Sequence, residues 1–545
     1  MRAGRRPKSA CSGIALIGII MVIVVLGFLG GSVLMLTTSG SMKSLQALNW
    51  SKAFFAAESG ISLARTCLFS TNPIYTNLPW TGMVGSASFS ATIETNAGNN
   101  VIVSSIGIQG DSRWTSKWRL PAEIAGGALV VYHEKDVHSP RYRTWSNTNG
   151  LSTNELTALQ DPMNRDAQWY RIMANPLRDE YLLAVQDEGR RISAQTWING
   201  TWVSNTLFTG TAPADYARGF DIAYEQTSGR GMMVYSVGTA NPQYCIWDAN
   251  RWSNPIAMDV GAGAAVQWIR LVAKPESNEI MCLARWRTTK GKKRNYSSAI
   301  VWNGSAWIDN ISLEEDLNSK IECETMDATY SASGALVVYI GDPSAEGAWQ
   351  YLKYRTYTTG WSPQNAMSEI YGGTPYWIRV EYSADGALAY AAILQSGRSL
   401  EGTVWNGSAW GPYTQFSTSP VMEDPAKRCF DIAWSSRTNI LMVAFCLQNE
   451  DKYSYWLSTN GTDFTNGLMP AVNHPPAWGS WAAKWCVLKA DPLSPEFFHL
   501  SLNKGSHVNF QRWDGAAWTN YPEPEVNSEP DYLSIDMAFS RNPEP

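Results

Sequence analysis

The chain has 545 residues, of which 44% are hydrophobic and 17% are charged, and its formal net charge is −5. This balance excludes the strongly basic surface with which nucleic-acid-binding proteins contact phosphates. The 26 Trp, 24 Tyr and 43 Gly residues favour many short strands joined by glycine-containing turns, so we expect a mainly β protein beyond the N-terminus.

The N-terminus combines basic residues with a long apolar run. Arg2, Arg5, Arg6 and Lys8 precede Ile14–Leu36, a run without charged residues. As a helix with a rise of about 1.5 Å per residue, this run would extend about 34 Å and cross a bilayer. Its apolar core is too long for a cleaved secretory signal. We therefore expect a single-pass inner-membrane protein with a cytoplasmic N-terminus and an extracytoplasmic head.

An amphipathic pattern follows the apolar run. Between Ala47 and Leu68, apolar residues recur at alternating steps of three and four, and no proline interrupts the pattern before Pro73. We therefore predict a basic leader at 1–13, one long transmembrane and amphipathic helix at 14–72, and a small β region at 73–120. The predicted packing seam of the helix consists of Ala47, Trp50, Phe54, Ala57, Ile61, Ala64 and Leu68.

The leader ending at Gly13, the apolar helix and the segment AFFAAESGISLAR at Ala53–Arg65 resemble the N-terminal region of PilX-type minor pilins of type IV pili and related pseudopilins. The resemblance covers about the first 70 residues, and the β segment up to residue 118 also looks like a small pilin head. It implies that a prepilin peptidase cuts after Gly13 and frees Ile14. Most major pilins carry Glu at the fifth mature position, where this chain has Gly18, so the resemblance is to a minor subunit. A plain signal anchor is the alternative.

A repeated segment organises the rest of the chain. VWNGSAW occurs at Val301–Trp307 and at Val404–Trp410, and TWINGTW and RWDGAAW are its relatives. Asn-Gly between strand residues predicts a hairpin turn with positive φ at both central residues, and the two tryptophans then share one face of the hairpin. The first tryptophans of the four copies are separated by 105, 103 and 108 residues, and they are Trp197, Trp302, Trp405 and Trp513.

Weaker hairpins lie midway between these copies, so that hairpins recur about every 50 residues, each preceded by two further strand-like segments. Four strands in each of eight such units predict an eight-bladed β-propeller over residues 121–545, built as four two-blade repeats. The first unit lacks its first strand, and an unmatched first-strand sequence stands at Ser534–Asn542. We expect this C-terminal strand to close the ring and remove its open edge.

Acidic and basic residues alternate at one position of the predicted innermost strands. In one interpretation, Asp221, Asp327, Asp431 and Asp536 form a structural ring of inter-blade ion pairs with the bases. In the other, Arg171, Arg270 and Arg379 bind an anionic ligand. Val487 breaks the alternation, and Lys489, two residues later on the same strand face, is the candidate substitute. In ring order the aligned residues are Asp536, Arg171, Asp221, Arg270, Asp327, Arg379, Asp431 and Val487.

Other polar features carry weaker predictions. Cys429 and Cys446 flank a predicted turn and are candidates for a disulfide. His133 and His138 are expected on opposite faces of a strand end, so we predict neither a metal site nor a cofactor. A basic loop is either solvated or a second binding site, for polyanions such as sulfated glycans, and it consists of Lys290, Lys292, Lys293 and Arg294.

These patterns predict a minor component, at the tip or in priming, of a type IV pilus-like or pseudopilus system, with a propeller head for adhesion or ligand recognition. The expected partners are other pilins through the N-terminal helix, the membrane, and a glycan or another surface ligand, without nucleic acid. The alternatives are a membrane-anchored propeller enzyme acting on glycans and an assembly scaffold for other minor pilins. The chain contains no familiar hydrolase, P-loop or dinucleotide motif, which favours binding over catalysis.

Overall fold

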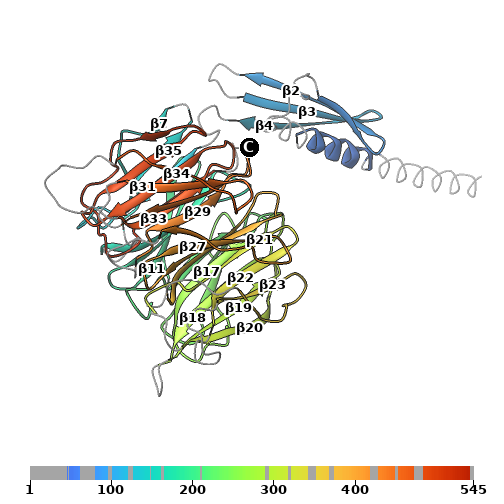
Figure 1. Ribbon diagram of the computed structural model, residues 1–545. Coiled ribbons are helices and arrows are strands. Elements are labelled where there is room, and N and C mark those ends of the chain that lie inside the picture. Colours follow the sequence, from blue (N-terminus) through green and yellow to red (C-terminus); the bar gives the residue numbers. More distant parts are fainter. Residues whose placement is uncertain are drawn as a thin grey trace, which may run out of the picture. The chain divides into compact units, whose positions relative to one another are not determined.

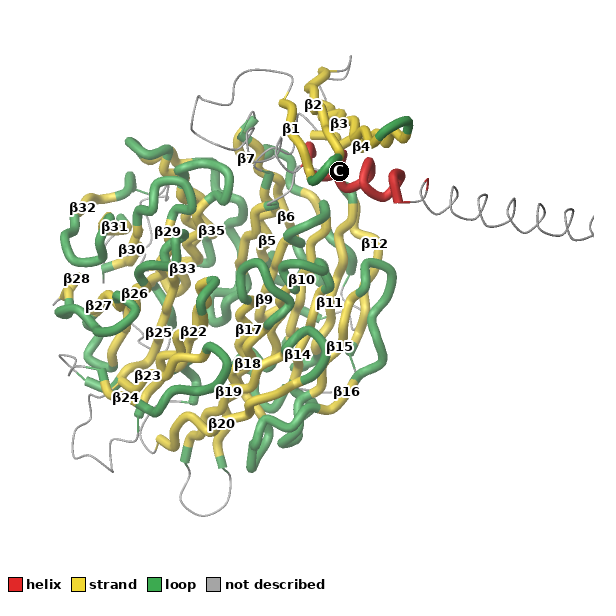
Figure 2. The backbone as a smooth tube through the Cα atoms, turned by 90° about the vertical axis from the view of Figure 1, so that its right-hand side faces the viewer, coloured by secondary structure: helices red, strands yellow, loops and turns green. Residues whose placement is uncertain are grey.

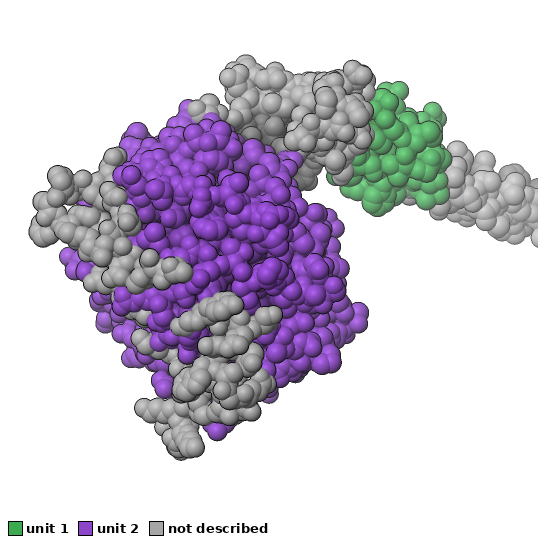
Figure 3. Space-filling view, in the orientation of Figure 1, with its two compact units in different colours: residues 1–122, 545 green, residues 123–544 purple. Residues whose placement is uncertain are grey.

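The computed structural model describes residue 46, residues 48–61, 80–95 and 101–120, and residues 127–540 apart from several internal segments. The segments outside the described part are 148, 161–164, 209–211, 289–293, 317–320, 342–351, 368–372, 418–426, 448–451 and 472–482. The chain divides into two compact units, residues 1–122 with 545 (unit 1) and residues 123–544 (unit 2), as Figure 3 shows.

Unit 1 contains a helix packed on a four-stranded antiparallel meander (Figure 1). The helix, residues 48–61, turns small side chains toward the sheet, and Ala53, Ala56 and Ala57 are fully buried. Gly107 permits this close approach, because a Cβ there would collide with the backbone oxygen of Ala53. The strands, in sheet order, are β1 (Trp80–Val84), β2 (Ala87–Thr95), β3 (Val101–Gln109) and β4 (Ser112–Leu120).

The prediction of a long transmembrane helix is wrong for the part of the chain that the structure describes. Its helix is short, and no helix among the described residues is both long and apolar enough to cross a membrane. The same finding contradicts the predicted single-pass inner-membrane location. The apolar run Ile14–Leu36 and the cleavage site at Gly13 and Ile14 lie outside the described residues.

The predicted packing seam of the helix is confirmed at Ala57 and Ile61, which are buried, but not at Trp50 and Phe54. Trp50 and Phe54 contact Trp114 of β4 but remain 54% and 36% exposed. The sheet accepts the alanine stripe instead, because Gly60 and Gly107 bring the backbones of the helix and β3 too close together for bulky side chains. Size, rather than hydrophobicity alone, therefore selects which face of this helix is buried.

Unit 2 is a closed β-propeller of eight antiparallel blades (Figures 1 and 2). The first strands of successive blades contact one another around the whole ring and line its centre. The β part of the fold prediction agrees with this topology. Blades 1 to 4 are β37 (Ile535–Phe539), β5 (Ala128–Tyr132), β6 (Arg141–Ser146), β7 (Gly150–Leu151) and β8 (Leu156–Thr157); β9 (Ala167–Ala174), β10 (Glu180–Asp187), β11 (Ile192–Ile198) and β12 (Thr201–Leu207); β13 (Phe220–Tyr224), β14 (Gly231–Tyr235), β15 (Gln243–Trp247) and β16 (Ile256–Ala257); and β17 (Val266–Ala273), β18 (Ile280–Arg287), β19 (Asn295–Trp302) and β20 (Trp307–Asp316). Blades 5 to 8 are β21 (Met326–Ser331), β22 (Gly334–Ile340), β23 (Leu352–Tyr357) and β24 (Asn365–Ala366); β25 (Pro375–Tyr382), β26 (Ala389–Gln395), β27 (Leu400–Trp405) and β28 (Thr414–Ser417); β29 (Phe430–Trp434), β30 (Leu441–Cys446), β31 (Tyr453–Ser458) and β32 (Thr465–Leu468); and β33 (Ala483–Ala490), β34 (Phe497–Asn503), β35 (Val508–Trp513) and β36 (Trp518–Asn520).

The repeated tryptophans pair across the outer hairpins of the even blades. Their ring centroids lie 5.3–5.6 Å apart, and a tyrosine from the third strand of the preceding blade packs against each pair. These aromatic contacts seal the outer joint between the two blades of each repeat. The pairs are Trp197–Trp202, Trp302–Trp307, Trp405–Trp410 and Trp513–Trp518.

The turn in VWNGSAW differs from the predicted one. Asn199 and Gly200 of TWINGTW both have positive φ, at 48° and 89°. In VWNGSAW, only Gly304 does, at 95°, and the Asn303 side chain accepts hydrogen bonds from the backbone N–H groups of Ser305 and Ala306. Four residues separate the tryptophans in both segments. In TWINGTW the strands stay paired up to Ile198 and Thr201, whereas in VWNGSAW the pairing ends at Trp302 and Trp307, so the loop contains four residues and the asparagine side chain stabilises it in place of a two-residue turn.

The C-terminal strand β37 is the closing element of the ring. It pairs antiparallel with β5, and Ile535 and Met537 in it are completely buried. We expect deletion of residues 535–545 to expose the edge of β5 and to destabilise unit 2 severely, because each lost buried side chain costs about 2–5 kcal/mol. Thermal denaturation followed by circular dichroism, with size-exclusion chromatography for aggregation, measures the effect. Deletion of residues 541–545 alone is the control, and equal stability of the two variants would contradict this role of β37.

Candidate functional site

Four buried aspartates join neighbouring blades at the centre of the propeller. Each lies on the first strand of an odd blade, and its Oδ2 accepts a hydrogen bond from a backbone N–H on the first strand of the next blade, at 2.9–3.1 Å. The four are at most 3% exposed, and a buried carboxylate requires such donors. We call them the clamp aspartates, and each pairs with one residue: Asp536 with Ile172, Asp221 with Leu271, Asp327 with Val380, and Asp431 with Leu488.

Three arginines link the clamp aspartates to one another. Each lies on an even blade, and its Nε contacts the aspartate of the following blade at 2.9–3.2 Å. Its Nη1 lies 3.1–3.6 Å from the aspartate of the preceding blade. None of the hydrogen bonds among the described residues uses Nη2, so each guanidinium is positioned by two carboxylates and retains free donors. These are Arg171, Arg270 and Arg379, which sequence analysis singled out.

These charges stabilise one another in the buried ring. Burial alone raises the pKa of the Asp327 carboxyl, but the guanidinium groups of Arg270 and Arg379 hold its pKa below the ordinary value. Burial likewise raises the pKa of the Asp431 carboxyl, but the guanidinium groups of Arg428 and Arg379 outweigh this effect and lower its pKa strongly. Asp327 and Asp431 therefore accept hydrogen bonds as carboxylates at neutral pH.

The ring of ion pairs is interrupted between blades 8 and 1. Val487 occupies the position of the fourth arginine, and Asp431 is paired instead with Arg428 at 2.9 Å, a residue on the approach to its own strand. Lys489, the substitute proposed from the sequence, makes no ion pair among the described residues but lines the same central space as the arginines. The structure thus leaves one lysine unpaired where the repeat is broken.

A ring of four tryptophans closes one end of the central channel. Each lies two residues before the arginine position of an even blade and is at most 2% exposed. Neighbouring rings meet edge to face, with centroids 5.5–5.7 Å apart, and the contacts run round the full circle. Only a small void of about 20 Å³ separates them from the charged ring. The four are Trp169, Trp268, Trp377 and Trp485.

The other end of the channel is an open cavity of about 340 Å³, which we call the central cavity. Arg171, Arg270, Arg379 and Lys489 line it together with apolar residues from the ends of the first strands. Glu381 is the one carboxylate among the described lining residues. A blind cavity with convergent polar groups and apolar walls is the usual form of a small-molecule site, so this cavity is the candidate functional site.

The other predicted site residues lie elsewhere. Arg294 belongs to the base of the β18–β19 loop, where its backbone pairs with Thr288, and Lys290, Lys292 and Lys293 lie outside the described residues. Arg294 is not among the described residues that line the central cavity.

The predicted disulfide is not formed. Cys429 and Cys446 are opposite each other, as expected, with a backbone hydrogen bond between them, but both are buried thiols and form no disulfide. The Cys446 sulfur instead accepts a hydrogen bond from the backbone N–H of Ala483 on the next blade, at 3.3 Å. It also lies 3.3 Å from the backbone oxygen of the following residue, Leu447. Burial raises the pKa of the Cys429 thiol well above its ordinary value, so the thiol stays protonated.

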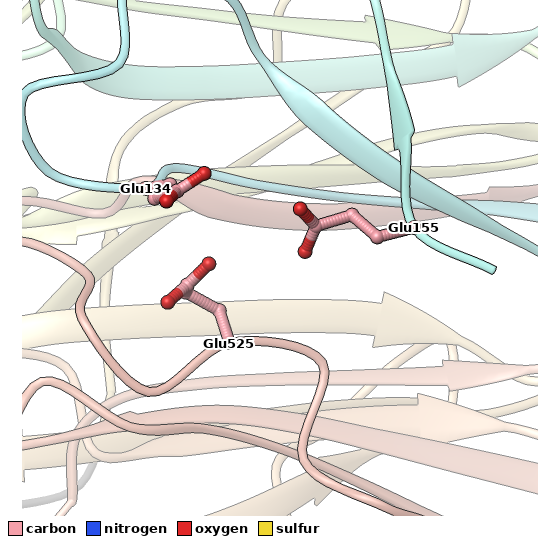
Figure 4. Close-up of side chains that lie close together, drawn as sticks. All are labelled: Glu134, Glu155 and Glu525. Carbon is pink, nitrogen blue, oxygen red and sulfur yellow. The ribbon is translucent and has the colours of Figure 1, made fainter. Parts of the chain in front are cut away.

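Three glutamates of blade 1 and the loop before β37 approach one another within 4.8 Å: Glu134, Glu155 and Glu525 (Figure 4). Protein donors already engage all three. Arg141 contacts Glu134 at 2.7 Å and Glu155 at 3.4 Å, and backbone N–H groups bind Glu525. We therefore interpret the cluster as a structural connection and assign no metal to it.

His133 and His138 were expected on opposite faces, but both approach Asp166. His133 Nε2 lies 3.8 Å and His138 Nδ1 lies 3.1 Å from its carboxylate. The chain turns between the two histidines instead of continuing as a strand, which brings them to one side.

No protein-family model matches this chain, and no curated protein matches it. Among solved structures, the BP39L lectin from Burkholderia pseudomallei is similar to 66% of this chain over 99% of its own, with 10% identity and a TM-score of 0.45. The fucose-specific lectin from Aleuria aurantia matches 67% of this chain over 99% of its own (12% identity, TM-score 0.34). The β-propeller domain of the Trilobed protease from Pyrococcus furiosus matches 69% over 97% of its own (9% identity, TM-score 0.34). At these identities and TM-scores, the similarity assigns no function to the chain.

Removal of one clamp aspartate tests the energetic role of the ring. In Asp327→Ala, the guanidinium groups of Arg270 and Arg379 each lose a buried partner, and the N–H of Val380 loses its acceptor. We expect a loss of about 3–5 kcal/mol in the free energy of unfolding, measured by denaturant titration. Asp463→Ala removes an exposed carboxylate and should change it by less than about 0.5 kcal/mol. Similar values for the two variants would show that the clamp contributes little.

Proposed function

We propose that the protein is a recognition protein whose propeller binds a small anionic ligand in the central cavity. The observation that carries this proposal is the convergence of Arg171, Arg270, Arg379 and Lys489 on one blind cavity. The arginines are positioned by carboxylates before any ligand arrives, so binding costs little additional side-chain order. Their unused donors suit a carboxylate, phosphate or sulfate group.

The charge of the lining favours binding over glycoside hydrolysis. Glycoside hydrolysis generally requires a pair of carboxyl groups flanking the scissile bond. Among the described residues that line the cavity, Glu381 is the one carboxylate, and the clamp aspartates are committed to backbone and arginine donors. A volume of about 340 Å³ suits one small molecule or one terminal acidic sugar rather than a long glycan.

Ligand binding is testable with the full chain. We expect isothermal titration calorimetry to detect binding of small carboxylic acids or acidic sugars, chosen from a panel and a glycan array. Lys489→Met should weaken this binding about 10-fold or more, because it removes a charged donor that forms no ion pair with the part of the chain that the structure describes. Lys452→Met, at an exposed lysine before β31, is the matched control. A panel and an array without any acidic binder would refute the proposed function.

We further propose that unit 1 is a minor-pilin-like module that joins pilin-like subunits and carries the propeller into a filament. This proposal rests on the resemblance of the segment Ala53–Arg65 and on an exposed aromatic surface of the helix. Trp50 and Phe54 lie against Trp114, with ring centroids 5.1 and 5.4 Å apart, and border a hollow of about 560 Å³ with Phe55. An exposed apolar patch of this kind is typical of a protein interface.

Phe55→Ser tests this interface, because Phe55 is 61% exposed and its loss leaves the packed alanines intact. We expect the unaltered chain to co-purify with pilin-like proteins produced in the same cell, and the variant to lose most of this association. Met83→Ser, at a 70% exposed residue of β1, should retain it. Failure of the unaltered chain to co-purify with any such protein would contradict the filament role and would leave the cavity proposal untouched.

A further inference from the structure

One set of residues that lines the central cavity, next to the arginines, does not follow the four-fold repeat of the chain. The residue two positions after each arginine site lines the cavity in every even blade. In blades 2 and 4 it is apolar, Met173 and Val272. In blades 6 and 8 it is charged, Glu381 and Lys489. The cavity therefore has an apolar side, and a charged side with one acid and one base.

Glu381 and Lys489 are separated by space rather than joined by a contact. No ion pair among the described residues includes either side chain. Both also line a second hollow of about 240 Å³, which shares them with the central cavity and is lined as well by Ala433 and Ser436 of blade 7. An acid and a base that face the same space without meeting are complementary to a ligand that carries both charges.

We propose that the central cavity binds a free α-amino acid with an apolar side chain. The ligand carboxylate contacts Lys489 and the neighbouring free arginine donors, and the ligand ammonium contacts Glu381. The apolar side chain lies on the wall formed by Met173, Val272 and the adjacent alanines, Ala174 and Ala273. This inference rests on the proposed function, because the carboxylate part is the anion that the cavity recognises.

The ionisation of the two charged residues agrees with this arrangement. Burial raises the pKa of Glu381 to about 7, an effect that Lys489 and Arg379 oppose and that Asp431 reinforces. Burial and the charges of Arg171 and Arg379 lower the pKa of Lys489 to about 8, against the opposite effect of Asp536 and Asp431. Below about pH 7 Glu381 becomes protonated, and above about pH 8 Lys489 becomes neutral. Amino-acid affinity should therefore be highest between these two values and fall on either side.

The experiment compares three probes on the full chain by isothermal titration calorimetry: L-leucine, 4-methylpentanoate, which lacks the ammonium group, and leucinamide, which lacks the carboxylate. We expect leucine to bind at least 10-fold more tightly than either analogue. Glu381→Gln keeps the shape of the side chain and should bring the affinity for leucine down to that for 4-methylpentanoate, whose own affinity should not change. Glu188→Gln, at an exposed glutamate outside the cavity, is the matched control for the loss of one carboxylate.

Different results separate this inference from the proposed function. Equal binding of leucine and 4-methylpentanoate, or an unchanged leucine affinity in Glu381→Gln, would overturn the amino-acid inference while the anion site stands. Leucinamide binding as tightly as leucine would overturn it as well, because the carboxylate would then contribute nothing. Absence of binding by all three probes, together with an acid panel and a glycan array without a binder, would overturn both proposals.

Discussion

The propeller depends on a buried carboxylate that accepts a backbone N–H from the neighbouring blade. The four clamp aspartates repeat this contact once in each two-blade unit, with N···O distances of 2.9–3.1 Å. A buried charge is tolerated only where donors surround it, so the arginines that complete the shell are held in fixed positions. The same contacts that dock the blades thereby prepare the guanidinium groups that line the central cavity. Stability and the candidate site are two results of one arrangement.

The ring of ion pairs is interrupted close to the place where the C-terminal strand closes the propeller. Clamp contacts act within each two-blade unit, and arginine ion pairs connect successive units, except between blades 8 and 1, where Val487 stands in the arginine position. Next to this interruption, within blade 1, β37 from the C-terminus pairs with β5 and completes the sheet. Lys489, which forms no ion pair with the described residues, lines the central cavity here.

The outer rim and the central axis of the propeller differ in how regularly the sequence repeat is kept. At the rim, tryptophan pairs and tyrosines seal the outer joints, and the repeat is regular. At the axis, the tryptophan ring makes the channel blind, and the residues above the charged ring depart from the repeat in blades 6 and 8. Residues that repeat strictly from blade to blade therefore pack the blades together. Residues that depart from the repeat line the surface that would select a ligand. The repeated segment VWNGSAW is one of those that pack the blades together.

The sequence by itself determined the number of blades, the closing strand and the alternation of Asp and Arg, because these follow from patterns that recur about every 50 residues along the chain. It did not determine all of the side-chain contacts. The Cys429 and Cys446 thiols stay apart because one of them faces the next blade, and Trp50 stays exposed because a glycine in β3 admits only small residues. Arg428 rather than Lys489 pairs with Asp431, and Glu381 shares a cavity with a lysine 108 positions away. Only closure of the ring sets such distances, since it brings together strands that are remote in the chain.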